Sequence, residues 1–521
     1  MLFNSPLYGA FLVAAFAVFW FACRGGRGRA PFLVLASYLF YGYGTWDAAR
    51  DEAVPIPALA WALLCIGVLF AGSTISFLVG RALGRTKKAR VRSALLVLAV
   101  VYQLSVLSFF KYWNFGVDSL AWVASAAGVP MHAAHLRFVL PFGISFFTFE
   151  SMSYVIDVWR GEIQPTDRYL DYFLFVGFFP HLVAGPIVRP SQMLPQLAAP
   201  PSADAVTQGR GLWRIATGLA KKIVIGDYLA RAIVDRVFAA PERFSALEVL
   251  LAIYAYAAQI YADFSGYTDV AIGSAALFGY ELPENFDAPY LASNLQDFWR
   301  RWHISLSTWL RDYLYKPLGG SRRGTVRTYA NVMITMVLGG LWHGASWTFV
   351  AWGALHGGAL VVTRVVQRAL SRQDRRIEQG GFDRHLVGAG SQSAVASSPA
   401  RAQARVGRLR AASHSLAVLA TLHFVCFAWV FFRAPSFAHA TLALRQLGLG
   451  GWSLDHVSAR VVAVLSIAAL LHVLPRTWET ATRDRFARTP ALLQGVVLAA
   501  FGVALHLVAD AKPEPFVYGQ F

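Results

Sequence analysis

Two histidines, each directly after a tryptophan, are the residues of this chain best suited to acid–base chemistry. His303 lies in the sequence RRWHIS, and His343 lies 40 positions later in GGLWHGAS. An apolar run over residues 329–341 leads into His343, whereas cations surround His303: Arg300, Arg301, Arg311, Lys316, Arg322 and Arg323. Ionisable groups are costly to bury in apolar surroundings and mark functional sites there. We therefore expect residues 297–358 to form an active site at membrane depth.

The residues beside His343 favour a role in proton transfer. Gly339, Gly340 and Gly344 flank it, and small residues allow helices and substrates to approach closely. A histidine in a low-dielectric site should be mostly neutral at pH 7, because desolvation disfavours the cation. A neutral imidazole can accept a proton from an attacking hydroxyl.

Local sequence leaves the roles of His303 and His356 open. The RRWHIS motif alone would also suit an interfacial residue on a basic amphipathic helix. His356 follows His343 by 13 positions and could either orient a partner or simply pack. A metal site is the competing use of three histidines, but zinc ligands usually include close pairs such as H-x3-H with acids nearby. The spacings of 40 and 13 do not fit that pattern, and we predict no metal.

The elements that must position these residues are membrane helices. The chain has 521 residues, of which 56% are hydrophobic and 15% charged, and its mean hydropathy is +0.47. A soluble protein would carry roughly 25% charged residues. Apolar runs of about 17 to 25 residues, enough to cross the hydrocarbon core, recur along the chain. We predict an all-α, polytopic membrane protein with a single membrane-embedded domain over residues 1–521.

The charge distribution predicts the orientation of the spans. The first apolar run, residues 7–23, lacks a preceding basic residue and is followed by arginines, which is typical of an uncleaved span with its N-terminus outside. The loop over residues 81–92 carries six cations and should be cytoplasmic. The net charge of +18 fits this bias of cytoplasmic loops. Basic clusters between spans argue against nucleic acid as a partner, and both termini are predicted to lie outside the cell membrane.

Polar residues interrupt several apolar runs and should face a protein interior or water. Glu150 and Asp157 lie in the run over residues 140–158, and Pro180 and Pro186 break the run over residues 171–188. Such a break is tolerated only where protein or water lines the backbone. An aromatic-basic cluster over residues 111–115 is typical of an interface anchor.

The sequence QIYADFSGYTDVAIG places polar groups in the middle of the long apolar run over residues 247–278. Gly266 in this motif predicts a break between two half-helices. Asp263 and Asp269 either hold helices together in a polar network or contact a ligand. A transporter or channel would use such carboxylates as an ion path, and this remains an alternative from a different functional class.

An arginine-rich segment separates this region from the last spans. Ten arginines and three acids lie between residues 364 and 410, among many Ser, Gln, Gly and Ala residues. The composition predicts a largely disordered cytoplasmic loop at about residues 370–412. The last apolar runs follow at residues 415–432, 461–474 and 491–508.

An ordered set of motifs along most of the chain resembles the membrane-bound O-acyltransferase family, and within it the bacterial alginate O-acetylase branch. The motifs are FKYWNF (residues 110–115), LPFGISFFTFESMSYVIDVWRGE (140–162), FPHLVAGPIVRP (179–190), QIYADFSGYTDVAIG (259–273), NFDAPYLASNLQDFWRRWHISLSTWLRDYLY (285–315), LGGLWHGASWTFVAWGALHG (338–357) and WVFFRAPSF (429–437). The resemblance implies a helical core with broken or re-entrant segments around a central tunnel.

The resemblance also implies the roles of the candidate site residues. His343, in the WHG motif, falls on the central catalytic position, and His303 falls on the earlier polar position. Asn294 or Arg301 could orient the reacting groups or stabilise an oxyanion. Three further residues are possible supporting groups: Trp342, Asp263 and His356.

The implied function is O-acetylation of an exported polysaccharide, with alginate as the leading polymer. An acyl thioester such as acetyl-CoA would enter from the cytoplasmic side as a substrate, with no bound cofactor. The acceptor hydroxyl would belong to a sugar or to a serine on a periplasmic acetyltransferase partner. The implied location is the bacterial inner membrane, in contact with its lipids. Alternatives within the class are acylation of cellulose or peptidoglycan and D-alanylation of teichoic acid.

Overall fold

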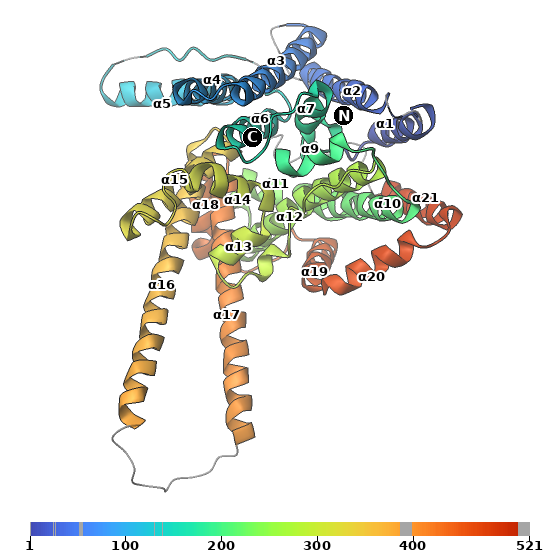
Figure 1. Cartoon of the computed structure of the whole chain (residues 1–521). Coiled ribbons are helices and arrows are strands. Elements are labelled where there is room, and N and C mark those ends of the chain that lie inside the picture. Colours follow the sequence, from blue (N-terminus) through green and yellow to red (C-terminus); the bar gives the residue numbers. More distant parts are fainter. Residues whose placement is uncertain are drawn as a thin grey trace. The chain divides into compact units, whose positions relative to one another are not determined.

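The computed structural model describes residues 2–508 except 24, 25, 27, 52–55, 130, 138 and 386–398. The described residues form helices and loops, with no strand among them (Figure 1). They divide into two compact units, here called unit 1 and unit 2. Unit 1 contains Met1–Asn285, Trp342–Ser346 and Leu442–Phe521, and unit 2 contains Phe286–Leu341 and Trp347–Thr441. The single domain expected from the sequence stays a prediction.

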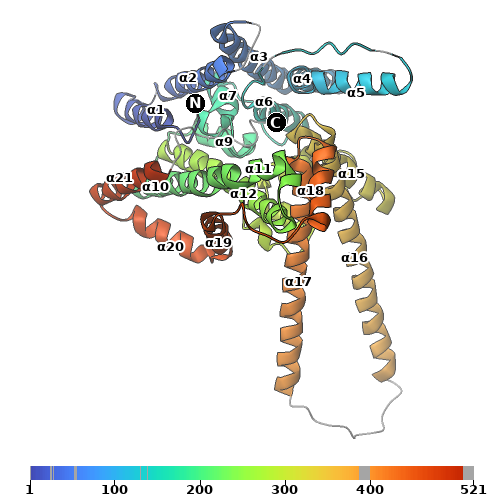
Figure 2. The same cartoon turned by 180° about the vertical axis from the view of Figure 1, so that it is seen from behind.

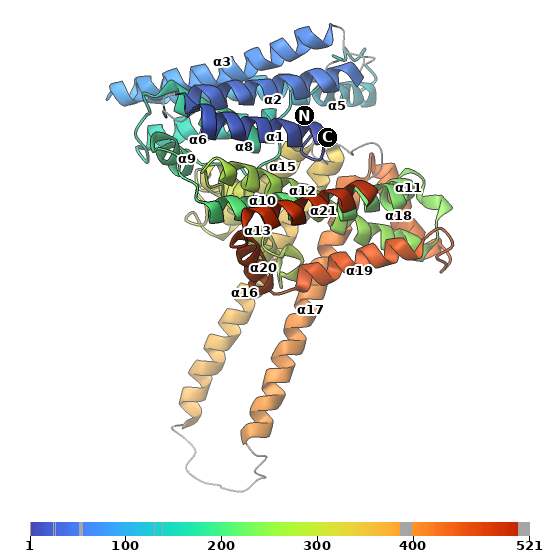
Figure 3. The same cartoon turned by 90° about the vertical axis from the view of Figure 1, so that its right-hand side faces the viewer.

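Unit 1 holds most of the helices. They are α1 (Pro6–Ala17), η1 (Val18–Ala22), α2 (Arg29–Asp51), α3 (Ala58–Arg85), α4 (Ala89–Leu107), η2 (Ser108–Tyr112), α5 (Trp113–Ala126), α6 (Ile144–Arg160), α7 (Tyr169–Gly177), α8 (Phe179–Leu182), α9 (Pro190–Ala198), α10 (Ala205–Ala220), η3 (Lys221–Asp227), η4 (Ala230–Val234), α11 (Asp235–Ala239), η5 (Pro241–Arg243), α12 (Ala246–Leu277), α19 (Ala459–Val473), α20 (Arg476–Ala487) and α21 (Ala491–Val508). Helices α2 and α3 lie along one another (Figure 3). Helix α6 packs on α3 and α4.

Unit 2 is smaller and contains the RRWHIS motif. Its helices are η6 (Pro289–Leu291), α13 (Leu295–Arg301), α14 (Ile304–Leu310), η7 (Arg311–Tyr315), α16 (Trp347–His385) and α17 (Pro399–Arg433). Two helices have residues in both units, namely α15 (Thr325–His343) and α18 (Phe437–Leu449).

Several helices are long and apolar enough to cross a membrane. Among the described residues there are six, or seven if α19 and α20, which meet at 91°, count as one broken span (Figure 2). Together with the absence of strands from the described ranges, this confirms the predicted class of an all-α, polytopic membrane protein.

Helix α12 corrects one prediction from the sequence. It runs unbroken from Ala246 to Leu277, so Gly266 does not separate two half-helices. The glycine serves close packing instead. A Cβ atom at Gly266 would lie 2.6 Å from the carbonyl oxygen of Gly218 on α10, and a Cβ atom at Gly218 would lie 2.6 Å from the carbonyl oxygen of Gly266. Gly211 and Gly273 repeat this reciprocal contact at 2.8 and 2.5 Å. The break prediction failed because a helical glycine can satisfy packing without ending the helix.

The predicted break in residues 171–188 is confirmed. Helix α7 ends at Gly177, the single turn α8 follows, and the backbone from Val183 to Arg189 is not helical. The Ser37 hydroxyl accepts a hydrogen bond from the freed Phe179 N–H at 3.1 Å. The Val188 N–H donates to the buried Glu150 carboxylate at 3.1 Å. Side chains thus satisfy backbone groups that a continuous helix would have paired.

The arginine-rich segment contains more helix than the sequence composition suggested. Helix α16 continues to His385 and α17 begins at Pro399, and the two lie side by side in unit 2 (Figures 1 and 2). This differs from the largely disordered loop expected over residues 370–412. Arginine, alanine and glutamine are strong helix formers, so two apolar helices can propagate into such sequence. Residues 386–398 lie outside the described part of the chain.

Candidate active site

His343 is the last residue of α15, and with Trp342 it belongs to unit 1. Residues 344–346 are not helical, and α16 starts at Trp347. The side chain is buried, with 2% of its surface exposed. A helix end presents unpaired backbone carbonyls together with its last side chains. His343 therefore lies where the chain must find polar partners outside its own helix.

Three side chains of unit 1 fix the end of α15. The ring of Trp342 stacks on Phe149 with centroids 5.4 Å apart and meets Phe146 edge-on at 5.7 Å, both from α6. The Lys111 ammonium of η2 donates hydrogen bonds to the carbonyl oxygens of Trp342 at 2.6 Å and His343 at 2.9 Å. Lys111, one of the residues expected to anchor an interface, therefore reaches the candidate catalytic motif.

His303 belongs to unit 2 and has an unusual backbone. It joins α13 to α14 with φ 42° and ψ 56°, a left-handed conformation that costs a residue with a Cβ atom roughly 1–2 kcal/mol. Its side chain is fully buried. Such strain in a buried residue points to a constrained site. The Ser307 N–H donates to the His303 carbonyl at 2.9 Å, which starts α14.

Aromatic side chains pack around Trp302, the residue before the fully buried His303. Trp302 stacks on Phe298 with centroids 5.7 Å apart and lies 5.1 Å from Trp429. His303 lies outside the candidate membrane spans, and burial lowers its pKa to about 3. The imidazole is therefore neutral at physiological pH and can exchange hydrogen bonds without carrying charge.

Asn294 and Arg301 hold the local structure of unit 2. The Asn294 side chain caps α13 by accepting a hydrogen bond from the Asp297 N–H at 2.9 Å. Arg301 donates to the Asp297 carboxylate at 3.0 Å and to the Asp287 carbonyl at 3.3 Å. Both residues therefore shape the helix that leads into His303. Their expected role in orienting the reacting groups stays a prediction.

His356 lies in an aromatic cluster of unit 2. Its ring centroid is 4.7 Å from that of Trp352 and 5.3 Å from that of Trp299. Phe298 links it to the surroundings of His303, because Phe298 stacks on both Trp302 and His356. Neither ring nitrogen of the buried His356 has a hydrogen-bond partner among the described residues. This placement favours packing but leaves both nitrogens able to meet a ligand.

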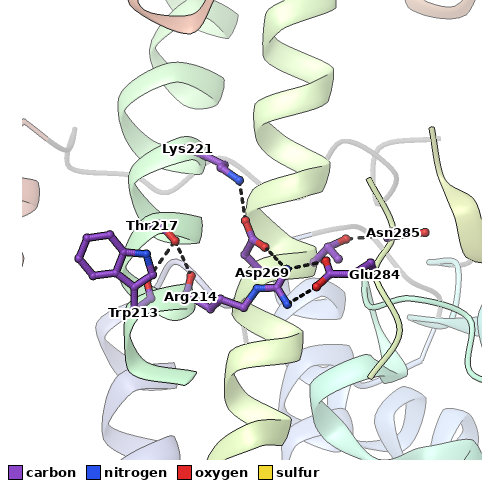
Figure 4. A network of polar contacts seen from close by, with 8 residues as sticks. Trp213, Arg214, Thr217, Lys221, Asp269, Glu284 and Asn285 are labelled. Atoms are coloured by element: carbon purple, nitrogen blue, oxygen red, sulfur yellow. Dashed lines mark hydrogen bonds and ion pairs between the residues drawn. The ribbon is translucent and has the colours of Figure 1, made fainter. Parts of the chain in front are cut away.

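The carboxylates in the middle of α12 are paired with cations of unit 1. Asp263 pairs with Lys222, which also binds Asp227 at 2.6 Å. Asp269 lies between Lys221 at 2.7 Å and Arg214 at 3.3 Å. Figure 4 shows Arg214 reaching from Asp269 to Glu284, which it binds through two hydrogen bonds of 2.7 and 2.6 Å. These pairs favour the polar-network interpretation of this motif.

The structure thus distributes the predicted site residues over both units. Unit 2 holds His303, Arg301, Asn294 and His356, whereas unit 1 holds His343, Trp342 and Asp263. Within the described ranges, no group of three or more His, Cys, Asp or Glu side chains could hold a metal ion. Sequence reasoning missed Lys111, because no local pattern connects it to a motif 232 positions away.

The fold and site describe a multi-pass membrane protein with buried histidines, and comparisons with known proteins identify its family. Residues 130–381 match the membrane-bound O-acyltransferase family model. Over 70% of its length the chain is similar to the probable alginate O-acetylases of Pseudomonas aeruginosa (41% identical, covering 66% of that protein) and Pseudomonas putida (42%, covering 71%). It is also similar to the peptidoglycan O-acetyltransferase of Helicobacter pylori, with 33% identity over 88% of this chain and 82% of that protein.

The chain belongs to the membrane-bound O-acyltransferase family. Family membership confirms the predicted class of enzyme, an O-acyltransferase that uses an acyl donor as substrate. The matched region contains both Trp-His motifs.

Proposed function

We propose that this enzyme moves an acetyl group from a cytoplasmic thioester toward the O-acetylation of an exported polysaccharide, with alginate as the first candidate. The observation that carries the proposal is the placement of His343, buried at the end of α15 with its backbone held by Lys111. The similarity to two probable alginate O-acetylases supports the choice of polymer.

In the proposed reaction His343 acts as the general base. Its imidazole takes the proton of the acceptor hydroxyl as the oxygen attacks the thioester carbonyl. The C–O bond forms, the C–S bond breaks, and the thiolate leaves with the proton that the imidazole returns. An uncharged imidazole in a water-poor site suits this exchange, because it binds the hydroxyl proton without competing water.

His303 supports the reaction as a neutral hydrogen-bonding group. Its lowered pKa keeps it from serving as a cation, so it would orient the acceptor or donate to the carbonyl oxygen as negative charge develops. The strained backbone at His303 fixes where that hydrogen bond can be made.

The donor, the location and the partner complete the proposal. The carrier part of acetyl-CoA or of another acetyl thioester is negatively charged. Exposed cations of unit 2, such as Arg311 and Lys316, could attract it.

The enzyme would lie in the inner membrane with both termini periplasmic. A periplasmic acetyltransferase partner would receive the acetyl group on a serine hydroxyl or act beside a sugar acceptor.

Peptidoglycan is the second candidate polymer. The similarity to the peptidoglycan O-acetyltransferase of Helicobacter pylori covers 88% of this chain, whereas the similarity to the alginate enzymes covers 70%. The family-level chemistry is the same for both polymers, so the choice between them depends on the acceptor.

Analysis of envelope polymers in cells with and without the gene tests the function. We expect ester-linked acetate on an exported polysaccharide in cells that express the wild-type chain and its loss when the gene is deleted. Mass spectrometry of isolated alginate and of peptidoglycan muropeptides separates the two candidates. Unchanged acetylation of both polymers after deletion would contradict the proposal.

A further inference from the structure

A lysine from a distant segment binds the backbone of the candidate catalytic motif. Lys111 lies in η2, a π-helical turn between α4 and α5. Its Nζ atom is 2.6 Å from the carbonyl oxygen of Trp342 and 2.9 Å from that of His343. A π-helical turn inserts an extra residue into a helix and often marks a functional position. Here the inserted turn directs a half-buried ammonium toward another helix.

Both carbonyls belong to the last turn of α15. Helix α15 ends at His343, so the carbonyls of its last turn have no N–H four residues further along the same helix. A cation at this end also interacts favourably with the negative pole of the helix dipole. Lys111 therefore supplies a capping interaction from outside the helix.

The side chain of Trp342 limits how the helix end can move. Phe149 stacks on its ring at an angle of 24°, and Phe146 contacts the ring edge-on. The Lys111 ammonium lies 5.9 Å from the centroid of the same ring, within the range of a cation–π contact. The neighbouring His343 ring lies 5.1 Å from that of Trp342. Lys111 thus binds the backbone of Trp342 and His343, while Phe146 and Phe149 hold the Trp342 side chain.

We propose that Lys111 is a positioning residue for the acyl transfer: it caps the last turn of α15 and thereby fixes the direction of the His343 imidazole. The proposal rests on the proposed function of His343. Lys111 does not contact the reacting atoms in this role and acts through the backbone. Small misplacements of a catalytic group cost up to about a hundredfold in rate, so a loose helix end should lower turnover.

A pair of substitutions tests the role. Lys111→Met keeps the length of the side chain and removes the donor, whereas Lys111→Arg keeps a charged donor. We expect Lys111→Met to lower kcat about 10- to 100-fold with KM for the thioester within about twofold, and Lys111→Arg to recover at least about a third of the wild-type kcat. Lys88→Met, which removes an exposed cation, is the matched control and should retain wild-type kinetics.

Hydrogen exchange provides a second measurement that does not depend on activity. We expect Lys111→Met to speed amide exchange in peptides covering residues 338–350, because the last turn of α15 opens more often. Exchange in α12 should not change. A general loss of structure would accelerate exchange in both helices.

The outcomes separate this inference from the proposed function. Unchanged exchange over residues 338–350 in Lys111→Met, or wild-type kcat in that variant, would overturn the role of Lys111. Equal losses of kcat in Lys111→Met and Lys111→Arg would also overturn it. Acyl transfer that survives His343→Ala would contradict the proposed function, and the exchange measurement would still decide whether Lys111 holds the helix end.

Discussion

His343 and His303 each directly follow a tryptophan, yet different kinds of contact hold the two residues in place. His343 ends a helix of 19 residues, and its backbone is bound by a lysine 232 positions away. His303 sits between two short helices in a left-handed conformation, and the contacts that shape the helix leading into it come from residues close in sequence. Both side chains are buried.

The difference shows which contacts each histidine depends on. Around His303, the cap by Asn294 and the Asp297–Arg301 pair form within one segment of 8 residues. Around His343, the decisive contacts come from η2 and α6 and exist only after the chain has folded. A single substitution at a distant position can therefore displace His343, whereas His303 should tolerate the loss of any one local contact.

The largest expected effect belongs to His343 itself. We expect His343→Ala to lower the rate of acyl transfer by about a thousandfold or more, because no other group would take the hydroxyl proton. Acetate released or transferred per enzyme is the measurement, with protein level and membrane insertion compared by immunoblot. The exposed His506→Ala is the control and should keep wild-type activity. Activity within tenfold of wild type in His343→Ala would remove His343 from the reaction.

A smaller loss of activity is expected at His303, where substitutions can test the roles of the backbone conformation and of the imidazole separately. Asparagine adopts the left-handed conformation more readily than most residues, so His303→Asn keeps the turn and removes the imidazole. We expect about a hundredfold lower kcat with a stable protein. His303→Gly relieves the backbone strain and should be as inactive. If His303→Gly retained wild-type kcat, the residue would matter for its backbone alone.

The same comparison explains how far the sequence could predict this protein. Helix positions, the broken segment after Gly177 and the candidate histidines follow from hydropathy, proline and motif patterns. The contact of Lys111 with His343 could not be predicted, because the same aromatic-basic pattern suits an interface anchor. Gly266 was misjudged for a related reason: a glycine that ends a helix and one that admits a neighbouring helix look alike until the partner, here Gly218, is known.

A modest effect is expected from breaking one local contact near His303. Arg301→Gln removes the half-buried ion pair with Asp297, and such pairs contribute about 0–1 kcal/mol. We expect kcat to fall no more than about fivefold, well below the loss expected for Lys111→Met. Arg327→Gln, an exposed change in the same unit, is the control. A loss for Arg301→Gln as large as that for His303→Asn would show that Arg301 acts directly in the reaction.

The last prediction concerns stability rather than rate: the buried His303 should make the protein less stable as the pH is lowered. The unfolded imidazole binds a proton below about pH 6.5, whereas the folded one binds it only near its pKa of about 3. Between these values the unfolded state holds more protons, so stability falls as the pH is lowered, by about 2 kcal/mol at pH 5. His303→Asn removes this contribution. Thermal unfolding in detergent should therefore show a smaller drop from pH 7.5 to pH 5 for His303→Asn than for wild type, with the exposed His506→Asn behaving as wild type. Equal drops in all three proteins would mean that His303 is not held neutral, and its proposed role as an uncharged hydrogen-bonding group in the reaction would fail.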